Sequence, residues 1–70
     1  MKGYDFDLPY DRIAELIDQW ILNEQHRAIL KRRLLDEIKF ESLEEEFKLS
    51  VRQIKRIVYR GEIRILRHIK

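Results

Sequence analysis

The sequence predicts an all-α fold of four helices, and three observations support that prediction. Pro occurs once, Gly twice and Thr not at all among 70 residues, so few residues favour turns. Leu, Ile, Glu, Lys and Arg dominate, and most of these side chains are unbranched helix formers. Apolar residues also recur at intervals of three and four, the spacing of a helix with one buried face.

Residues 1–10 alternate between apolar and polar side chains, which is typical of an extended segment. The apolar positions are Tyr4, Phe6, Leu8 and Tyr10. We expect residues 1–9 to form an N-terminal arm that lies on the domain or on a partner. A frayed terminus is the alternative. Residues 10–70 are then one helical domain.

The first helix is expected to begin near Pro9, since proline suits the first position of a helix. Its core-facing stripe is predicted at Ile13, Leu16, Ile17, Trp20 and Ile21. The spacing favours a core position for Trp20, and a contact surface is the alternative.

The second helix is predicted from Asn23, an N-cap, to about Asp36. Its inner residues are expected to be Ile29, Leu30 and Leu34, assisted by Ala28 and Leu35. Its exposed side is expected to be basic, with Arg27, Lys31, Arg32 and Arg33.

Two further helices complete the expected fold, a short acidic one over about residues 41–48 and a last one from Val51 toward His68. Ser50 is the predicted N-cap of the last helix. Leu43 and Phe47 are expected to face inward from the short helix. The inner stripe of the last helix is predicted at Val51, Ile54, Ile57, Val58 and Ile65. Gly61 lies on the same side, and we expect the helix to continue through it.

The charge is divided unevenly along the chain. The formal net charge of the whole chain is +2. Residues 1–47 have 7 basic and 12 acidic side chains, which gives this part a net charge of −5. Residues 48–70 form the other part. The second part has 8 basic side chains, one acidic side chain and a net charge of +7. This asymmetry favours an anionic partner for the C-terminal part.

Residues 40–59 have the layout of a helix-turn-helix, a short helix and a longer one joined by a turn of three or four residues. The outward face of the longer helix has an arginine at every fourth position, at Arg52, Arg56, Arg60 and Arg64, and Arg67 continues the line. Like charges at this spacing repel one another, so the line indicates a polyanionic ligand. Glu62 is expected to offset part of that repulsion.

Arginine and glutamine read base edges, and the first residues of the second helix contact bases in helix-turn-helix proteins. We therefore predict DNA base contacts by Arg52, Gln53, Lys55 and Arg56. Phosphate contacts are predicted for Ser50, Tyr59, Arg60, Arg64 and Arg33. The alternative is that the basic helix is a solvated face that complements the acidic side chains of Glu41, Glu44, Glu45 and Glu46.

The stretch from Leu22 to His68 resembles region 4 of bacterial sigma factors and the small phage-type regulators built on that domain. Leu22-Asn23 with Arg27, Ile29, Leu30, Arg33 and Leu34 resembles the opening helix of the family. Phe40-Glu41-Ser42-Leu43, Leu49-Ser50 and Ile54-Lys55 resemble the short helix, the turn and the recognition helix.

Two positions depart from this pattern, since the family usually has Ala at the place of Glu44 and Gly at the place of Lys48. Glu44 must then point outward, and Lys48 is expected to adopt a positive φ at some energetic cost.

The resemblance implies a sequence-specific transcription regulator in the winged-helix-like superfamily that binds double-stranded DNA and touches RNA polymerase. The alternative is a protein-interaction module that docks on RNA polymerase or self-associates, as a homodimer, without direct base readout. The first helix, with Trp20, and the N-terminal arm are the candidate contact surfaces.

Enzymatic chemistry is not expected. There is no Cys, and His26 and His68 lie far apart in sequence. Ser42 and Ser50 resemble cap or turn residues, and no glycine-rich phosphate loop is present. We therefore predict no cofactor and no metal site. No apolar run approaches the length of a membrane span, so a cytoplasmic protein without a membrane partner is expected.

Overall fold

The computed structural model describes residues 8–69, and this part of the chain is helical without any strand. The four helices are α1 (Tyr10–Trp20), α2 (Glu24–Leu34), α3 (Phe40–Phe47) and α4 (Val51–Leu66). The prediction of a four-helix, all-α fold is confirmed. Except for Leu8 and Pro9, the predicted N-terminal arm lies outside the described residues.

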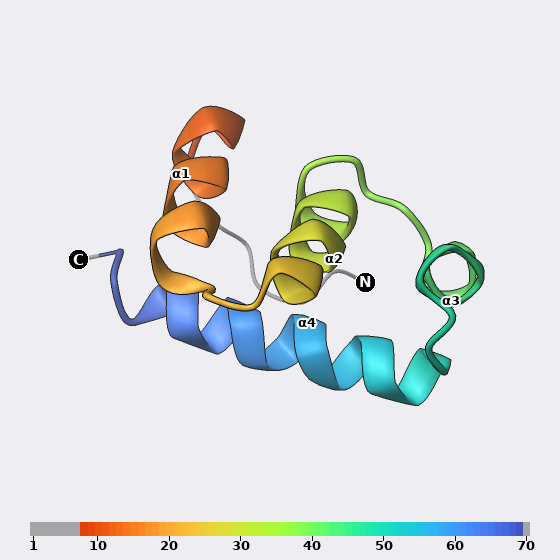
Figure 1. Cartoon of the computed structure of the whole chain (residues 1–70). Helices are drawn as coiled ribbons and strands as arrows, with labels where there is room; N and C mark the ends of the chain where they lie inside the picture. Colours follow the sequence, from red (N-terminus) through yellow and green to blue (C-terminus); the bar gives the residue numbers. More distant parts are fainter. Residues whose placement is uncertain (1–7, 70) are drawn as a thin grey trace.

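Helix α4 is the element on which the other three are assembled. It runs beneath α1, α2 and α3 and contacts each of them (Figure 1). The view looks nearly along the axis of α3, whereas α4 lies across it, so the two helices meet at a steep angle (Figure 1). One face of α4 is therefore covered along its length, and the opposite face remains outside.

The core lies between α4 and the other helices. Its buried apolar side chains are Ile13, Leu16, Ile17, Ile21, Ile29, Leu30, Leu43, Ile54, Val58 and Ile65. All ten belong to the predicted inner stripes, which confirms the helical spacing read from the sequence. Leu34, Phe47 and Ile57 are only half-buried and pack at the margin of this core.

Two predictions about individual side chains are wrong. Trp20, the last residue of α1, is 37 % exposed and its ring stacks on His68, with 3.6 Å between the ring centroids. Glu62 does not lie among the arginines: it is 2 % exposed, on the inner face of α4 between Val58 and Ile65.

The corner between α1 and α2 is held by side chains that bind its carbonyl groups. Arg27 donates to the carbonyl oxygens of Ile21 and Leu22 at 3.0 and 3.1 Å. Arg64 of α4 donates to the carbonyl of Trp20 at 2.8 Å. The Asn23 side chain accepts from the His26 amide, which confirms the predicted N-cap. Carbonyls at a helix end have no partner within the helix, so these bonds fix where α1 stops.

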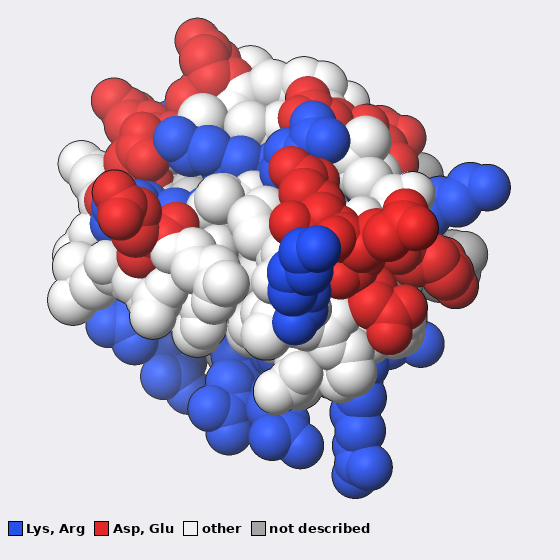
Figure 2. All heavy atoms as spheres, turned by 45° about the vertical axis from the view of Figure 1, so that its right-hand side comes forward, with Lys and Arg blue, Asp and Glu red and all other residues white. Residues whose placement is uncertain are grey.

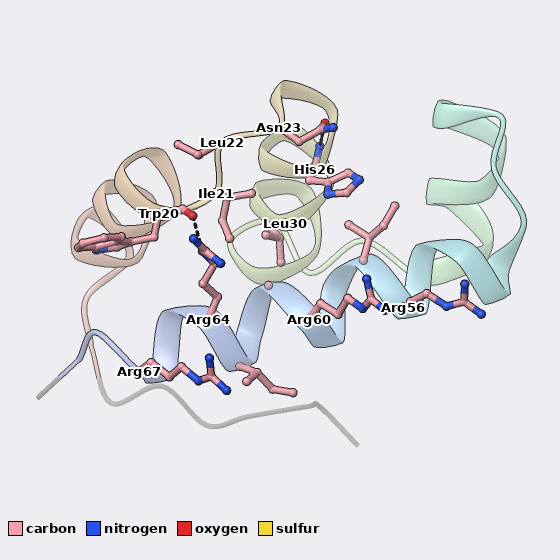
Figure 3. A pocket seen from close by; sticks show the side chains of 13 residues that line it. Trp20, Ile21, Leu22, Asn23, His26, Leu30, Arg56, Arg60, Arg64 and Arg67 are labelled. Atoms are coloured by element: carbon pink, nitrogen blue, oxygen red, sulfur yellow. Dashed lines mark hydrogen bonds between the residues drawn. The ribbon is translucent and has the colours of Figure 1, made fainter.

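Leu30 of α2 packs directly over Gly61 of α4. The helix continues through Gly61, as expected, and both residues are buried. A Cβ at position 61 would lie 2.8 Å from Leu30 Cδ2 and still closer to Cδ1, so only glycine leaves room for the leucine. Figure 3 shows Leu30 pointing down onto α4 at this position.

No helix among the described residues is long and apolar enough to cross a membrane.

We predict that Gly61→Ala destabilises the protein, although alanine is the better helix former. Alanine gains about 1 kcal/mol in helix propensity, whereas overpacking a filled core costs about 1–3 kcal/mol. The expected net loss in the free energy of unfolding is about 1 kcal/mol, measured by urea denaturation.

The matched background for that measurement is Leu30→Val, because valine lacks the two Cδ atoms that a new Cβ would meet. In this background, Gly61→Ala should be neutral or stabilising. Equal losses in both backgrounds would contradict the assigned contact.

Candidate nucleic-acid interface

The turn between α3 and α4 fixes how the two helices meet. Lys48 ends α3 in the left-handed conformation (φ 60°, ψ 36°), and its amide donates to the Glu44 carbonyl at 2.9 Å. Glu44 itself is exposed, so both departures from the sigma-factor pattern are accommodated as expected. Leu49 then packs against the core. The short helix, three-residue turn and longer helix predicted at 40–59 are thus present.

Ser50 begins α4 with a reciprocal capping box. Its hydroxyl accepts from the Gln53 amide at 3.2 Å, and the Gln53 side-chain oxygen accepts from the Ser50 amide at 3.0 Å. This arrangement confirms the predicted N-cap and satisfies two backbone donors of the first turn. The capping box also occupies the side-chain oxygen of Gln53, so only the side-chain NH₂ group of Gln53 remains to contact a base edge.

The outward face of α4 presents arginines that have no partner among residues 8–69. Arg52, Arg56 and Arg60 are exposed, and in the part of the chain that the structure describes they form no hydrogen bond or ion pair. Figure 2 shows lysine and arginine side chains projecting from the lower edge of the molecule, whereas acidic side chains gather above them. This face can therefore offer its guanidinium groups to a ligand.

The cations of α2 are used differently, since each is already bound inside the protein. Lys31 pairs with Asp18 of α1 at 2.8 Å, and Arg32 pairs with Glu46 of α3 at 3.1 Å and with Asp36 at 3.2 Å. The hydrogen bond and charge of Glu46 raise the pKa of Arg32 above its usual value. The exposed basic side predicted for α2 is thus half-buried and serves to join helices.

Phe40 gathers three of the predicted site residues around its ring. The Arg33 guanidinium lies 4.2 Å from the ring centroid, the Lys55 ammonium lies 5.5 Å from it, and the Tyr59 ring meets it edge-on at 6.4 Å. Arg33 also donates to the Ile38 carbonyl at 3.0 Å, which leaves other guanidinium N–H groups free of assigned partners. The ring thus places cations from α2 and α4 side by side.

Arg64, also a predicted phosphate ligand, differs from Arg52, Arg56 and Arg60 because its Nε already donates to a carbonyl, which leaves its terminal guanidinium N–H groups without an assigned partner among the described residues. Its bond to the Trp20 carbonyl turns the side chain toward α1, as Figure 3 shows. The structure therefore brings together Arg52, Arg56 and Arg60 along α4, with Lys55, Tyr59 and Arg33 beside them.

Sequence reasoning missed two features of this site. The sequence indicates Phe40 only as part of the short helix, whereas in the fold its ring lies under two cations and makes cation–π contacts. Glu62 could have been placed correctly, because it is four residues after Val58 and three before Ile65.

Within residues 8–69 no group of three His, Cys, Asp or Glu side chains could hold a metal ion. Comparisons of this chain with protein-family models, with curated proteins and with solved structures found no match.

We predict that Lys48→Gly raises the free energy of unfolding by about 1 kcal/mol, because glycine adopts the left-handed conformation without a steric penalty. Lys48→Ala is the matched control, since it removes the same charge and keeps the strained backbone. A gain of equal size in Lys48→Ala, measured by urea denaturation, would assign the effect to charge instead.

We predict that Arg64→Ala lowers the free energy of unfolding by about 1 kcal/mol through loss of its hydrogen bond to Trp20. Arg60→Ala, one turn earlier on the same helix, should change stability by less than about 0.5 kcal/mol, as expected for a surface residue without partners. Equal effects of the two substitutions in urea denaturation would refute the structural role of Arg64.

Proposed function

We propose that this protein is a sequence-specific DNA-binding transcription regulator that places the start of α4 in the major groove. Its architecture would then be the helix-turn-helix of sigma factor region 4, which the sequence resembles. The observation that carries the proposal is the row of Arg52, Arg56 and Arg60, which are exposed and unpaired among the described residues.

Physical chemistry supports a polyanion as the ligand of this row. Arginines four residues apart on one helix repel one another, and each such pair costs about 0.2–0.5 kcal/mol. The cations of α2 pair with carboxylates or carbonyls, so Arg52, Arg56 and Arg60 of α4 differ from them. Phosphates of duplex DNA would relieve that repulsion along the whole row.

Within the row, the residues have distinct proposed roles. Arg52 and Arg56 lie in the first two turns of α4, the part of a recognition helix that reaches base edges. Arg60 lies a turn farther on and would bind the phosphate backbone, together with the Phe40-centred group of Arg33 and Tyr59. The exposed carboxylates of α3 would repel phosphates and so favour one docking orientation.

The competing proposal is a module that docks on RNA polymerase or on a second copy of itself. Such a module would bind DNA without base preference or not at all. A symmetric dimer would instead reveal itself as a palindromic binding site, because two recognition helices would read two half-sites.

We predict that selection of bound sequences from a random duplex pool yields a consensus for the wild-type protein. In Arg56→Ala, preference at the contacted base pair should fall by about 1–3 kcal/mol, while the other positions keep theirs. Recovery of no consensus from the wild-type pool would count against base readout.

Arg60→Ala is the matched variant for a phosphate contact. It should weaken binding to all sequences by similar factors and reduce the slope of log affinity against log salt by about one. The measurement is fluorescence anisotropy of a labelled duplex over a range of salt concentrations. A change in sequence preference in Arg60→Ala would contradict the assigned roles.

A further inference from the structure

A cleft of about 540 Å³ lies between the α1–α2 corner and the C-terminal half of α4. Leu30 and Gly61 form its floor, and Asn23 and His26 border it at the start of α2 (Figure 3). Its volume falls in the range of about 300–1,000 Å³ that is typical of small-molecule sites.

The apolar part of this cleft is unusually accessible to solvent. Trp20, Leu22 and Ile63 are 37 %, 80 % and 42 % exposed, and all three line it. Leu22 comes from the α1–α2 corner and Ile63 from α4. The Trp20 ring, in contrast, points away from Leu30 and Arg60 in Figure 3 and stacks on His68, so Leu22 and Ile63 are the exposed apolar side chains left to receive a ligand. An apolar ligand would bury surface that now contacts water.

The charged part of the cleft is entirely cationic. Arg56, Arg60, Arg64 and Arg67 line it, and no carboxylate of residues 8–69 does. Arg64 is held by the Trp20 carbonyl, whereas the other three form no hydrogen bond or ion pair in the described part of the chain. Guanidinium groups bind carboxylates and phosphates through paired hydrogen bonds, so the lining selects an anionic head group.

We propose that this cleft binds a small amphipathic anion, an organic molecule with an apolar body and a carboxylate or phosphate head. The apolar body would lie against Leu22, Ile57 and Ile63, which line the cleft and are at least partly exposed, and the head would pair with Arg60 and Arg67. An acidic peptide is the rival occupant. The cleft has the volume of a small-molecule site and is confined to the α1–α2 corner and α4, so a small molecule fits it better.

The cleft shares two arginines with the DNA-binding face. Arg56 and Arg60 line it and also belong to the proposed base-contacting and phosphate-contacting sets. A bound anion would neutralise Arg60 and place its negative charge near Arg56, so the ligand would compete with DNA and act as an inhibitor. This regulatory consequence, unlike the site itself, rests on the proposed DNA-binding function.

The test of the site uses decanoate, below its micelle concentration, and amide spectra of the full chain without DNA. Shifts are expected at residues 21–23, 26 and 57–67, whereas acetate and decanol should cause none at equal concentration. Arg60→Gln should weaken decanoate binding about tenfold through loss of one charge-assisted contact. Arg52→Gln, an α4 arginine that does not line the cleft, should change it less than about twofold.

Equal weakening by Arg60→Gln and Arg52→Gln would overturn the proposal, because it would reduce binding to general attraction by a basic helix. Shifts confined to other residues would overturn it as well. The proposal would also be overturned if a peptide containing Glu and Leu bound the cleft and decanoate did not bind. That result would assign the cleft to a protein partner. Ile63→Ser serves as a second variant, expected to weaken decanoate without altering the charge.

A second measurement separates the site from its regulatory role. Labelled duplex is titrated with protein at fixed decanoate, and the apparent dissociation constant for DNA should rise with decanoate concentration. Decanoate binding with unchanged DNA affinity would overturn the competition alone. Decanoate binding by a protein that binds no duplex would leave the cleft assigned and refute the DNA-binding function instead.

Discussion

The contact of Leu30 with Gly61 is the constraint on which the rest of the structure depends. It lets the Leu30 side chain of α2 lie directly against the backbone of α4, where a Cβ would force that side chain to shift. Helix α4 contacts α1, α2 and α3, so the position of α2 on it influences where both neighbours lie. A glycine that weakens the helix in isolation thus improves the packing of a core of ten apolar side chains in a chain of only 70 residues.

The distribution of cations separates scaffold from candidate interface. Arg27 and Arg64 hold the corner carbonyls after α1, while Lys31 and Arg32 join α2 to its neighbours through carboxylates. Exposed ion pairs of this kind each contribute little, about 0–1 kcal/mol, but they direct side chains that would otherwise extend into solvent. Arg52, Arg56 and Arg60 of α4 have no such partner among the described residues. Both helices are rich in arginine, so the difference between them lies in the surroundings of the arginines and not in composition.

Much of the fold could be predicted from the sequence, because local rules determine it. Asn23 and Ser50 were identified as N-caps from residue type and position, and both accept the expected backbone hydrogen bonds. The inner stripes followed from helical spacing. Where helices end and what lies past their ends depends on tertiary contacts, and so Trp20, at the last residue of α1, was placed wrongly in the core.

The candidate site was predictable only in part for the same reason. The row of Arg52, Arg56 and Arg60 is a property of one helix and could be read from spacing. That Arg64 turns away to Trp20, a residue 44 positions earlier, and that Arg33 meets Lys55 and Tyr59 over Phe40, requires the packing of α1, α2 and α3 on α4. The cleft beside α4 is likewise formed by three segments that no sequence pattern connects.

Mapping amide shifts on addition of duplex DNA tests the central claim most directly, because it reports the contacted surface residue by residue. At low salt, the account predicts the largest shifts at residues 50–60, with smaller ones near Arg33 and none over the acidic face of α3. The absence of shifts at residues 50–60, or shifts confined to the α1 surface, would contradict the claim that α4 is the DNA-reading helix.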